Sequence, residues 1–363
     1  MSTSKINLAI VGVGNCASSL IQGIEYYTQN PDASGLINRH IGVYKASDLN
    51  IVSAFDINKN KIGKTVSEAI FAVPNCATIF CRDTNFASLV SPSPHLDGIS
   101  DNVAGVVNPH DIQKSLDDWK SDIIEELRNK KVDILVSYLP VGSKLASEFY
   151  AECCLESGVA FANAIPEFIC SDLNWSDKFK QKGIPCTGDD IKSQIGATIV
   201  HRALVDLINQ RGQFVKNTYQ LNVGGNTDFL NMLDQNRLIS KRISKTEAVT
   251  SQIPYQTETR IGPSDYIPHL KDNKLAYINI QGTQFGGLDF SIELKLSVED
   301  SPNSAGVMMD VIRLLKVAKD NDLSGYQDFS GYYFKHPQKQ YRDEVAQGIV
   351  TDFLTKYDSN SKN

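Results

Sequence analysis

The residues with the clearest chemical signature are two glycines and an alanine, spaced Gly-x-Gly-x-x-Ala from Gly12 to Ala17. They follow an apolar run at residues 6–11, and unbroken hydrophobic runs are typical of buried parallel strands. The first glycine permits a tight turn, the second lets the backbone approach a pyrophosphate, and the third small residue lets helix pack on strand. Backbone N–H groups at the start of the following helix, aided by its dipole, would hold the diphosphate. The pattern predicts a dinucleotide site, although the motif alone also fits a tight strand-to-helix turn without a ligand.

A carboxylate ends the next apolar run, residues 51–56, where dinucleotide folds hold a ribose. Asp56 could accept both ribose hydroxyls of NAD, and its charge would repel the 2′-phosphate of NADP. Asp56 lies further along the chain than the usual gap of about 20 residues, so we expect residues 29–49 to form an inserted loop. A surface aspartate that caps a turn is the alternative.

A second loop rich in small residues, 188–198, follows a short predicted strand and enters a predicted helix at 199–211. Such a loop, flanked by Lys192 and hydroxyl groups, could hold a second anion such as a substrate phosphate. Ser193 could instead only cap the helix. The neighbouring acids Asp189 and Asp190 could bind a cation or position hydroxyls, or they could be solvated caps at a turn.

Two lysines further along the chain have the spacing of residues on one helix face. Lys241 and Lys245 are four residues apart, so both side chains would point the same way. They follow a segment, 224–231, in which flexible glycines precede polar side chains at the end of a predicted strand. A solvated surface position is the ordinary role of a lysine, and spacing alone does not separate the two interpretations.

The composition bounds the class of protein. With 363 residues, 41% of them hydrophobic, the chain can bury a sizeable core and suggests two domains. A formal net charge of −6 offers no basic surface for bulk nucleic acid or an anionic membrane. No apolar segment approaches the roughly 18 residues of a membrane span, and residues 1–5 lead into the first strand without a secretory signal. Seven cysteines without a Cys-x-x-Cys pair favour reduced thiols, so we expect a cytoplasmic protein.

The elements that must position these residues alternate between strand and helix in the first half of the chain. Strand-like runs at 132–140 and 159–163 enclose a helical pattern at 144–158. This alternation predicts an α/β fold with a doubly wound parallel sheet, whose loops at Gly12, Asp56, 140–143 and 163–166 should surround one crevice. Residues 74–108, rich in Pro, Ser and Asn, are expected to be an irregular excursion over the surface.

The second half changes to period two. Residues 218–223, 276–280 and 290–296 alternate between apolar and polar side chains, which predicts an antiparallel sheet with one wet face. Residues 282–287 would turn between the last two strands. Ser301 could then cap a helix with Pro302 at its first position, followed by one apolar stripe at helical spacing that we expect in the core.

Six stretches of the sequence together carry a resemblance to one enzyme family. These stretches are 12–20, 136–143, 188–194, 221–231, 240–246 and 300–306. They resemble inositol-3-phosphate synthase, also called myo-inositol-1-phosphate synthase, in its shorter prokaryotic form. Residues 194–198 depart from the Ser-Gly-Gln-Thr-type loop of the longer eukaryotic forms.

The resemblance implies an isomerising cyclisation of D-glucose 6-phosphate to 1D-myo-inositol 3-phosphate. In that family NAD is an internal redox relay: C5 is oxidised, an enolate from C6 closes on the C1 aldehyde, and the ketone is reduced again. Lysines suit this chemistry, because a phosphate and a developing enolate or alkoxide need fixed positive charge in a dry pocket. The glycine turn and Asp56 alone would also fit an NAD-dependent sugar or sugar-phosphate dehydrogenase, or a non-catalytic module that senses NAD.

Carried over position by position, the resemblance implies a set of site residues. Lys245 would contact phosphate and hydroxyls, Lys241 the C5 oxygen, and Lys274 and Lys335 the open chain and the C1 oxygen. Asp228 and Asp190 would orient hydroxyls or those lysines. The phosphate loop would comprise Lys192, Ser193, Gln194, Ala197 and Thr198. The residues implied in NAD binding are Gly12, Gly14, Asn15, Cys16, Ala17, Asp56, Ser137, Leu139, Pro140 and Asp189.

The resemblance also implies a domain plan and an assembly. Residues 1–200 and 300–363 would form an NAD-binding Rossmann domain, and residues 201–299 an inserted α+β domain for catalysis and tetramerisation. The open sheet of the inserted domain would pair between subunits of a homotetramer. Family members depend variously on a divalent metal or a monovalent cation, and no cluster of His or Cys ligands in the sequence decides between them.

Overall fold

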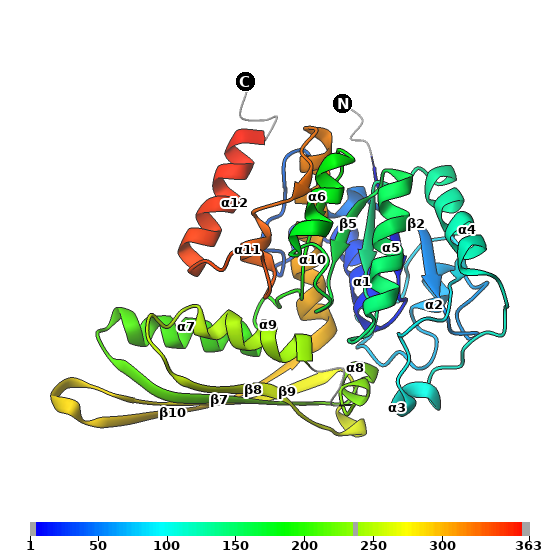
Figure 1. Ribbon diagram of the computed structural model, residues 1–363. Coiled ribbons are helices and arrows are strands. Elements are labelled where there is room, and N and C mark those ends of the chain that lie inside the picture. The colour runs from blue at the N-terminus through cyan, green and yellow to red at the C-terminus, as the bar shows by residue number, and fades with distance from the viewer. Residues whose placement is uncertain (1–4, 235–238, 358–363) are drawn as a thin grey trace.

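The computed structural model describes residues 5–234 and 239–357, which build two β-sheets (Figure 1). The larger sheet has seven parallel strands in the order β11-β6-β5-β4-β1-β2-β3. Its strands are β1 (Ile6–Val11), β2 (Leu49–Asp56), β3 (Val90–Pro92), β4 (Ile134–Ser137), β5 (Ala160–Asn163), β6 (Pro185–Thr187) and β11 (Gly325–Tyr326). The strand order changes direction between β1 and β4, so the predicted doubly wound parallel sheet is confirmed.

Helices cover both faces of the larger sheet, because right-handed crossovers leave its centre in opposite directions. One long helix, α10, packs along α1 and also contacts β4, β5 and β6, while α4 packs on α5. The helices in the segments that build this sheet are α1 (Asn15–Gln29), α2 (Val66–Ala69), α3 (Asp101–Ala104), α4 (Leu116–Asn129), α5 (Lys144–Ser157), α6 (Leu173–Gln181), α10 (Asp300–Asp320), α11 (Ser330–Tyr333) and α12 (Asp343–Tyr357). Short 3₁₀ turns occur at Ala46–Asp48, Pro268–Leu270 and Phe285–Gly287.

The smaller sheet has four strands in the order β10-β9-β7-β8. Helices α7 and α9 pack on each other and against β7, β8 and β9, so they cover one face of this sheet (Figure 1). The elements are α7 (Ala197–Gln210), β7 (Phe214–Gly224), α8 (Thr227–Asn231), α9 (Ile239–Thr250), β8 (Glu258–Tyr266), β9 (Asn273–Thr283) and β10 (Asp289–Glu299). The other face carries exposed side chains, as the period-two pattern predicts.

The predicted antiparallel pairing is confirmed for β7, β9 and β10, and the sheet has a further strand, β8, that was not predicted and runs parallel to β7. The chain travels from β7 to β8 through α8 and α9, and a crossover of this length permits parallel pairing. Residues 258–266 include a glycine, a proline and several charged side chains, so they show no alternation of apolar residues.

The expectation that residues 74–108 form only a surface excursion is also wrong in part. The segment contributes β3 to the edge of the larger sheet and buries Phe86, Val90 and Val103. β3 is three residues long and ends at Pro92, which suits a sheet edge but leaves almost no pattern to detect.

α10 begins at Asp300, so Ser301 is not its capping residue and Pro302 is not its first residue. The Ser301 N–H and hydroxyl instead donate to the two carboxylate oxygens of Asp272, at 3.1 and 2.8 Å. The Asp272 carboxylate therefore accepts hydrogen bonds from the N–H and hydroxyl groups of Ser301 at the start of α10. The predicted apolar stripe is confirmed as core, and its members are Val307, Met308, Val311, Leu314, Leu315 and Ala318.

A buried ion pair on α10 holds the inserted loop between α1 and β2. Asp310 and Arg313 are both fully buried, and the guanidinium donates to Asp310 Oδ1 at 2.6 Å. Arg313 also donates to the carbonyls of Asn38 and Arg39, at 2.8 and 2.9 Å. Burial raises the pKa of Asp310, although Arg313 opposes the shift. The pair therefore fixes the loop to the centre of the fold.

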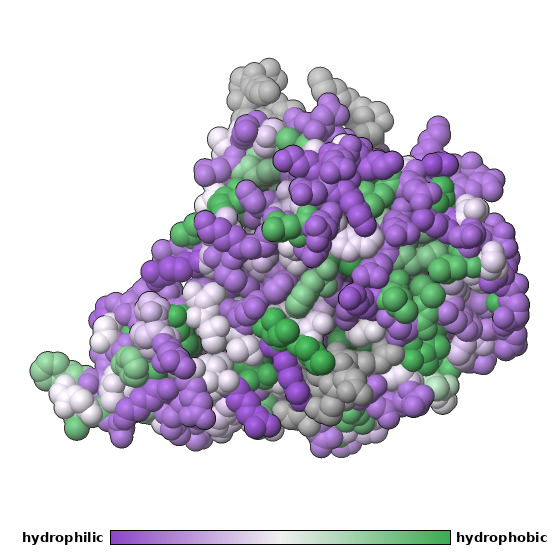
Figure 2. All heavy atoms as spheres, in the orientation of Figure 1, coloured by the Kyte–Doolittle hydropathy of each residue, from purple (hydrophilic) through white to green (hydrophobic). Residues whose placement is uncertain are grey.

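Polar and charged side chains cover most of the face seen in Figure 2, and hydrophobic side chains form scattered patches among them. Within the described ranges, no helix is both long and apolar enough to cross a membrane. All seven cysteines are free thiols, in agreement with the sequence expectation.

Asp310→Ala is expected to lower the free energy of unfolding by about 3–5 kcal/mol, because it leaves the Arg313 guanidinium buried without a counter-charge. Urea denaturation measures the change. The control is Asp32→Ala. The Asp32 side chain is 95% exposed and pairs with Arg39 in the same loop. This control should change little. Equal losses from the two variants would contradict the importance of the buried pair.

Candidate active site

One cavity lies where the carboxyl ends of the central strands of the larger sheet meet the smaller sheet and its helices. The glycine turn, the ends of β2 and β4, and the starts of α7 and α10 contribute to its wall, as do β7, α8 and α9. The predicted residues that the structure brings together here are Gly12, Gly14, Asn15, Cys16, Asp56, Leu139, Pro140, Asp190, Ser193, Ala197, Thr198, Asp228, Lys241, Lys245, Lys274 and Lys335.

The glycine turn leaves backbone exposed at one end of the cavity. Gly12 has φ +86°, and a Cβ there would lie 2.6 Å from the Tyr138 carbonyl oxygen, so only glycine fits. A Cβ at Gly14 would meet nothing within 4 Å, so open space faces this part of the turn. Ala17 lies fully buried beneath the turn, where it serves the close packing of α1 on the sheet. Burial, with Asp272 and Asp300, raises the pKa of the Cys16 thiol to about 12, so it stays protonated.

α9 presents two lysines to the cavity from one face. The Lys241 ammonium pairs with Asp228 of α8, with 2.8 Å between Nζ and Oδ2. Lys245 is 3% exposed and, within the described residues, makes no hydrogen bond or ion pair through its ammonium. The predicted i, i+4 arrangement is confirmed, and it gives one paired and one unpaired cation.

Asp190 follows β6 and Lys335 follows α11, 145 residues later in the chain, yet the two residues form a tight unit. Lys335 Nζ donates to Asp190 Oδ1 at 2.7 Å, and its backbone N–H donates to the Asp190 carbonyl at 2.8 Å. Ser244 of α9 donates its hydroxyl to Asp190 Oδ2. Asp190 has φ +59°, a left-handed conformation that is uncommon for residues other than glycine and often marks a functional site.

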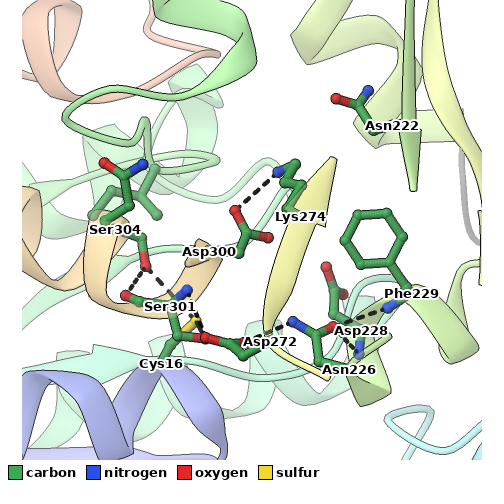
Figure 3. Close-up of polar contacts among 12 residues, drawn as sticks. Cys16, Asn222, Asn226, Asp228, Phe229, Asp272, Lys274, Asp300, Ser301 and Ser304 are labelled. Atoms are coloured by element: carbon green, nitrogen blue, oxygen red, sulfur yellow. Dashed lines mark hydrogen bonds and ion pairs between the residues drawn. The ribbon is translucent and has the colours of Figure 1, made fainter. Parts of the chain in front are cut away.

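Lys274 at the start of β9 pairs with Asp300 at the start of α10, with 2.9 Å between Nζ and Oδ1 (Figure 3). Below this pair, Asp272 accepts hydrogen bonds from Asn226 Nδ2 at 2.9 Å and from the Ser301 hydroxyl at 2.8 Å. Burial raises the pKa of Asp272 to about 6. The Asp300 N–H also donates to the Asp272 carbonyl at 3.0 Å, so the backbone joins these two acidic residues at the junction of the two sheets.

The cavity lysines differ in how burial and neighbouring charges shift their pKa values. Burial lowers the pKa of Lys245 well below its ordinary value, and the other three lysines lower it further. Burial also acts on Lys241, but Asp228 and Asp190 outweigh it and raise the pKa of that lysine. The pKa of Lys335 is lowered by burial, which its partner Asp190 only partly opposes. The pKa values of the cavity lysines are therefore shifted in different directions by burial and by their neighbours.

Two residues of the predicted phosphate loop do not face the cavity. Lys192 is buried, and its Nζ donates to the carbonyls of Gly331 and Tyr332, each at 3.0 Å. Its neighbours Ile191 and Ser193 line the cavity, and in an extended segment the side chain between them points the other way. Gln194 donates to the carbonyl of Gly35 in the inserted loop, at 2.6 Å. The structure therefore does not bring Lys192 and Gln194 to the cavity, and it gives no support to their predicted contacts with phosphate.

Asp189 and Ser137, both predicted to bind the cofactor, also lie outside the lining. The fully buried Asp189 carboxylate accepts hydrogen bonds from Asn163 Nδ2 at 2.7 Å and from the Ser171 N–H and hydroxyl at 3.0 and 2.8 Å. It therefore holds the loop after β5 rather than a ligand. Ser137 is the last residue of β4, and its hydroxyl is buried away from the cavity.

The position of α9 depends on contacts that the sequence did not reveal. Fully buried Arg202 of α7 donates to the Ala248 carbonyl of α9, to the Tyr341 carbonyl at 3.1 Å and to Asp343 at 2.6 Å. His336 Nδ1 lies 2.8 Å from Glu247 Oε2 of α9. These contacts hold the helix that carries Lys241 and Lys245 against the segment that carries Lys335.

Several residues that line the cavity or lie beside it were missed by sequence reasoning. Asp300 and Asn226 lie within stretches that carry the family resemblance, so a signal existed for them. Asp272 belongs to no motif, and only the fold brings it beside Asn226 and Ser301. Among the residues with described positions, no three His, Cys, Asp or Glu side chains gather in a way that could hold a metal ion.

Fold and site together define a class of protein: a two-sheet α/β enzyme whose cavity joins a dinucleotide-type glycine turn to a cluster of buried and half-buried lysines.

Comparison with known proteins identifies the family. Residues 196–301 match the family model for myo-inositol-1-phosphate synthase. The chain is 45% identical over 361 residues to inositol-3-phosphate synthase of Mycolicibacterium smegmatis, covering 96% of this chain and 98% of that one. It is 46% identical over 368 residues to the Corynebacterium glutamicum enzyme of the same name, covering 98% and 99%. The crystal structure of inositol-3-phosphate synthase from Caenorhabditis elegans shares the fold, with a TM-score of 0.79 and 17% identity over 99% of this chain and 88% of that one. The chain therefore belongs to the inositol-3-phosphate synthase family.

Lys192→Met is expected to change the pH dependence of stability. Burial lowers the pKa of Lys192 to about 7 in the folded state, whereas an unfolded lysine has a pKa of about 10.4. Between these values the folded chain binds fewer protons than the unfolded chain, so the free energy of unfolding rises with pH by up to about 1.4 kcal/mol per unit. Urea denaturation between pH 7 and 10 should show a shallower rise in the variant. The control Lys182→Met removes an exposed lysine and should keep the wild-type slope.

Proposed function

We propose that this chain converts D-glucose 6-phosphate to 1D-myo-inositol 3-phosphate by internal oxidation, enolisation, aldol closure and re-reduction. One observation carries the proposal: the glycine turn and four lysines from three separate segments share a single cavity. The membership of nearly the whole chain in the inositol-3-phosphate synthase family supports it.

The substrate phosphate is proposed to bind at the start of α7. Ser193 and Thr198 offer hydroxyl groups there, and Ala197 leaves space for the anion. The first N–H groups of this 14-residue helix favour negative charge. Lys245 supplies the positive charge, because its ammonium has no carboxylate partner among the described residues. A bound phosphate would stabilise the charged form of Lys245 that burial disfavours.

The three paired lysines are proposed to act on the oxygens of the open sugar. Lys241, paired with Asp228, would hold or move a proton at the C5 oxygen. Lys274 and Lys335, paired with Asp300 and Asp190, would stabilise negative charge at the C1 oxygen and on the enolate. Each carboxylate keeps its lysine oriented, so the cationic groups need little rearrangement when charge develops.

NAD is the cofactor that we propose for the glycine-turn end of the cavity. The residues fit such a group: a side chain at Gly12 would collide with a backbone carbonyl, and the space in front of Gly14 is open. Asn15, Cys16, Leu139 and Pro140 line the same end, and Asp56 ends β2 where ribose hydroxyls would be accepted. NAD, when bound, would supply the hydride acceptor and donor for a reaction without net redox change.

We also propose the inserted-domain plan, with residues 201–299 as the catalytic and assembly domain of a cytoplasmic homotetramer. The outer face of the smaller sheet, away from α7 and α9, supports an assembly role. Tyr219, Leu221 and Tyr277 are each about 40% exposed on it, and Leu221 lies directly opposite Tyr277 in the β7–β9 pairing.

Sedimentation equilibrium is expected to give a tetramer, which Leu221→Glu should dissociate. A wild-type monomer would contradict the assembly.

The activity is tested by incubating the protein with glucose 6-phosphate and NAD. Chromatography coupled to mass spectrometry should separate inositol phosphate from its isomer glucose 6-phosphate, and absorbance at the nicotinamide band should show no steady gain of NADH. NADH that rises in proportion to product would favour a sugar-phosphate dehydrogenase instead.

Lys245→Met should lower kcat/KM by at least about 100-fold through lost charge stabilisation. The control Lys216→Met removes a half-exposed lysine on β7 and should leave the rate unchanged.

A further inference from the structure

Lys61 is a buried lysine in the cavity wall that the proposed chemistry leaves unused. It is 4% exposed and follows the end of β2. Its Nζ donates to the Val13 carbonyl at 2.7 Å and to Asn75 Oδ1 at 3.0 Å. Asn75 Nδ2 donates to the same carbonyl at 3.1 Å. Lys61 therefore holds the middle of the glycine turn through its backbone.

Asp56 holds the other polar group of the same turn residue. The Val13 N–H donates to Asp56 Oδ2 at 2.9 Å, and this oxygen lies 3.7 Å from Lys61 Nζ. The second carboxylate oxygen accepts from the Asn58 N–H at 2.9 Å. The Lys61 and Asp56 side chains are only 5% and 10% exposed, so the two charges act on each other with little screening by water. Asp56, Lys61 and Val13 thus form one unit.

This unit changes what Asp56 can contribute to the choice of cofactor. A carboxylate at the end of β2 repels a ribose 2′-phosphate, yet an ammonium 3.7 Å away would attract the same group. An ammonium has three N–H donors. Val13 and Asn75 use two donors of Lys61, and the third faces the Asp56 carboxylate, so it becomes available to another anion only when the charge of Asp56 is removed. The combined effect of the two charges, rather than the carboxylate alone, therefore determines whether this site attracts or repels a 2′-phosphate.

We propose that Lys61 is a positioning residue of the glycine turn and carries a latent affinity for a ribose 2′-phosphate, which the charge of Asp56 masks. The inference rests on the proposed NAD site. Once Asp56 is made neutral, the Lys61 ammonium anchors the phosphate of NADP. Loss of Lys61 removes that anchor and one of the two side-chain donors that hold the Val13 carbonyl.

The experiment compares Asp56→Asn, Lys61→Met and the double variant by calorimetric titration with NAD and with NADP. Asn keeps an acceptor for the Val13 N–H while removing the charge. Asp56→Asn should raise the affinity for NADP relative to NAD by at least about tenfold, since a charge-assisted contact replaces a repulsion. The double variant should lose that gain, and Lys61→Met alone should weaken NAD without improving NADP. Asp56→Ser with and without Lys61→Met repeats the comparison with a smaller side chain.

The outcomes separate this inference from the proposed cofactor site. Equal NADP affinities in Asp56→Asn and in the double variant would overturn the role of Lys61 while leaving NAD binding intact. A wild-type protein that binds neither dinucleotide would overturn the cofactor site itself. Lys59→Met is the matched control, because Lys59 is two residues away, half-exposed and paired with Asp111. It should change neither affinity, and circular dichroism should show the same fold for every variant.

Discussion

The structure depends on the cost of placing four lysine side chains, each at most 18% exposed, together in one cavity. Burial disfavours each charge, and each lysine also repels the others. Three carboxylates, Asp190, Asp228 and Asp300, pair with three of the lysines, and Lys245 keeps no such partner among the described residues. This cluster therefore holds one more lysine than carboxylate, and the proposed phosphate of the substrate would offset that excess of positive charge.

The fold meets this demand by drawing the charged side chains from segments that are far apart in the sequence. α9 brings Lys245, β9 brings Lys274, and the turn after α11 brings Lys335. Ser244, Glu247 and the Ala248 carbonyl each tie α9 to the larger-sheet segments or to the buried Arg202. Rigid supports of this kind matter because stabilisation of a developing charge works best when the charged groups are already in position.

The local sequence pattern predicts the strands, turns and helices whose conformation is set by their own residues. The glycine turn, the central strands and the apolar stripe of α10 belong to this group, since each has an unbroken or periodic signal. β3 and β8 lack such a signal because they are short or carry proline, glycine and charge. Lys192 looked as suitable for phosphate as Lys245, but which lysine faces the cavity depends on how its backbone packs, and Lys192 turns into the core.

The backbone bonds between residues 189–190 and 335–336 have a consequence for synthesis. The Lys335 N–H donates to the Asp190 carbonyl, and Asp189 and His336 exchange bonds in both directions, at 3.1 and 3.2 Å. A ribosome must therefore release nearly the whole chain before this ladder forms, while the glycine turn emerges among the first residues. The unit of Lys335 and Asp190 therefore cannot form until α10 and α11 have been made, so the lysine cluster is completed late in synthesis.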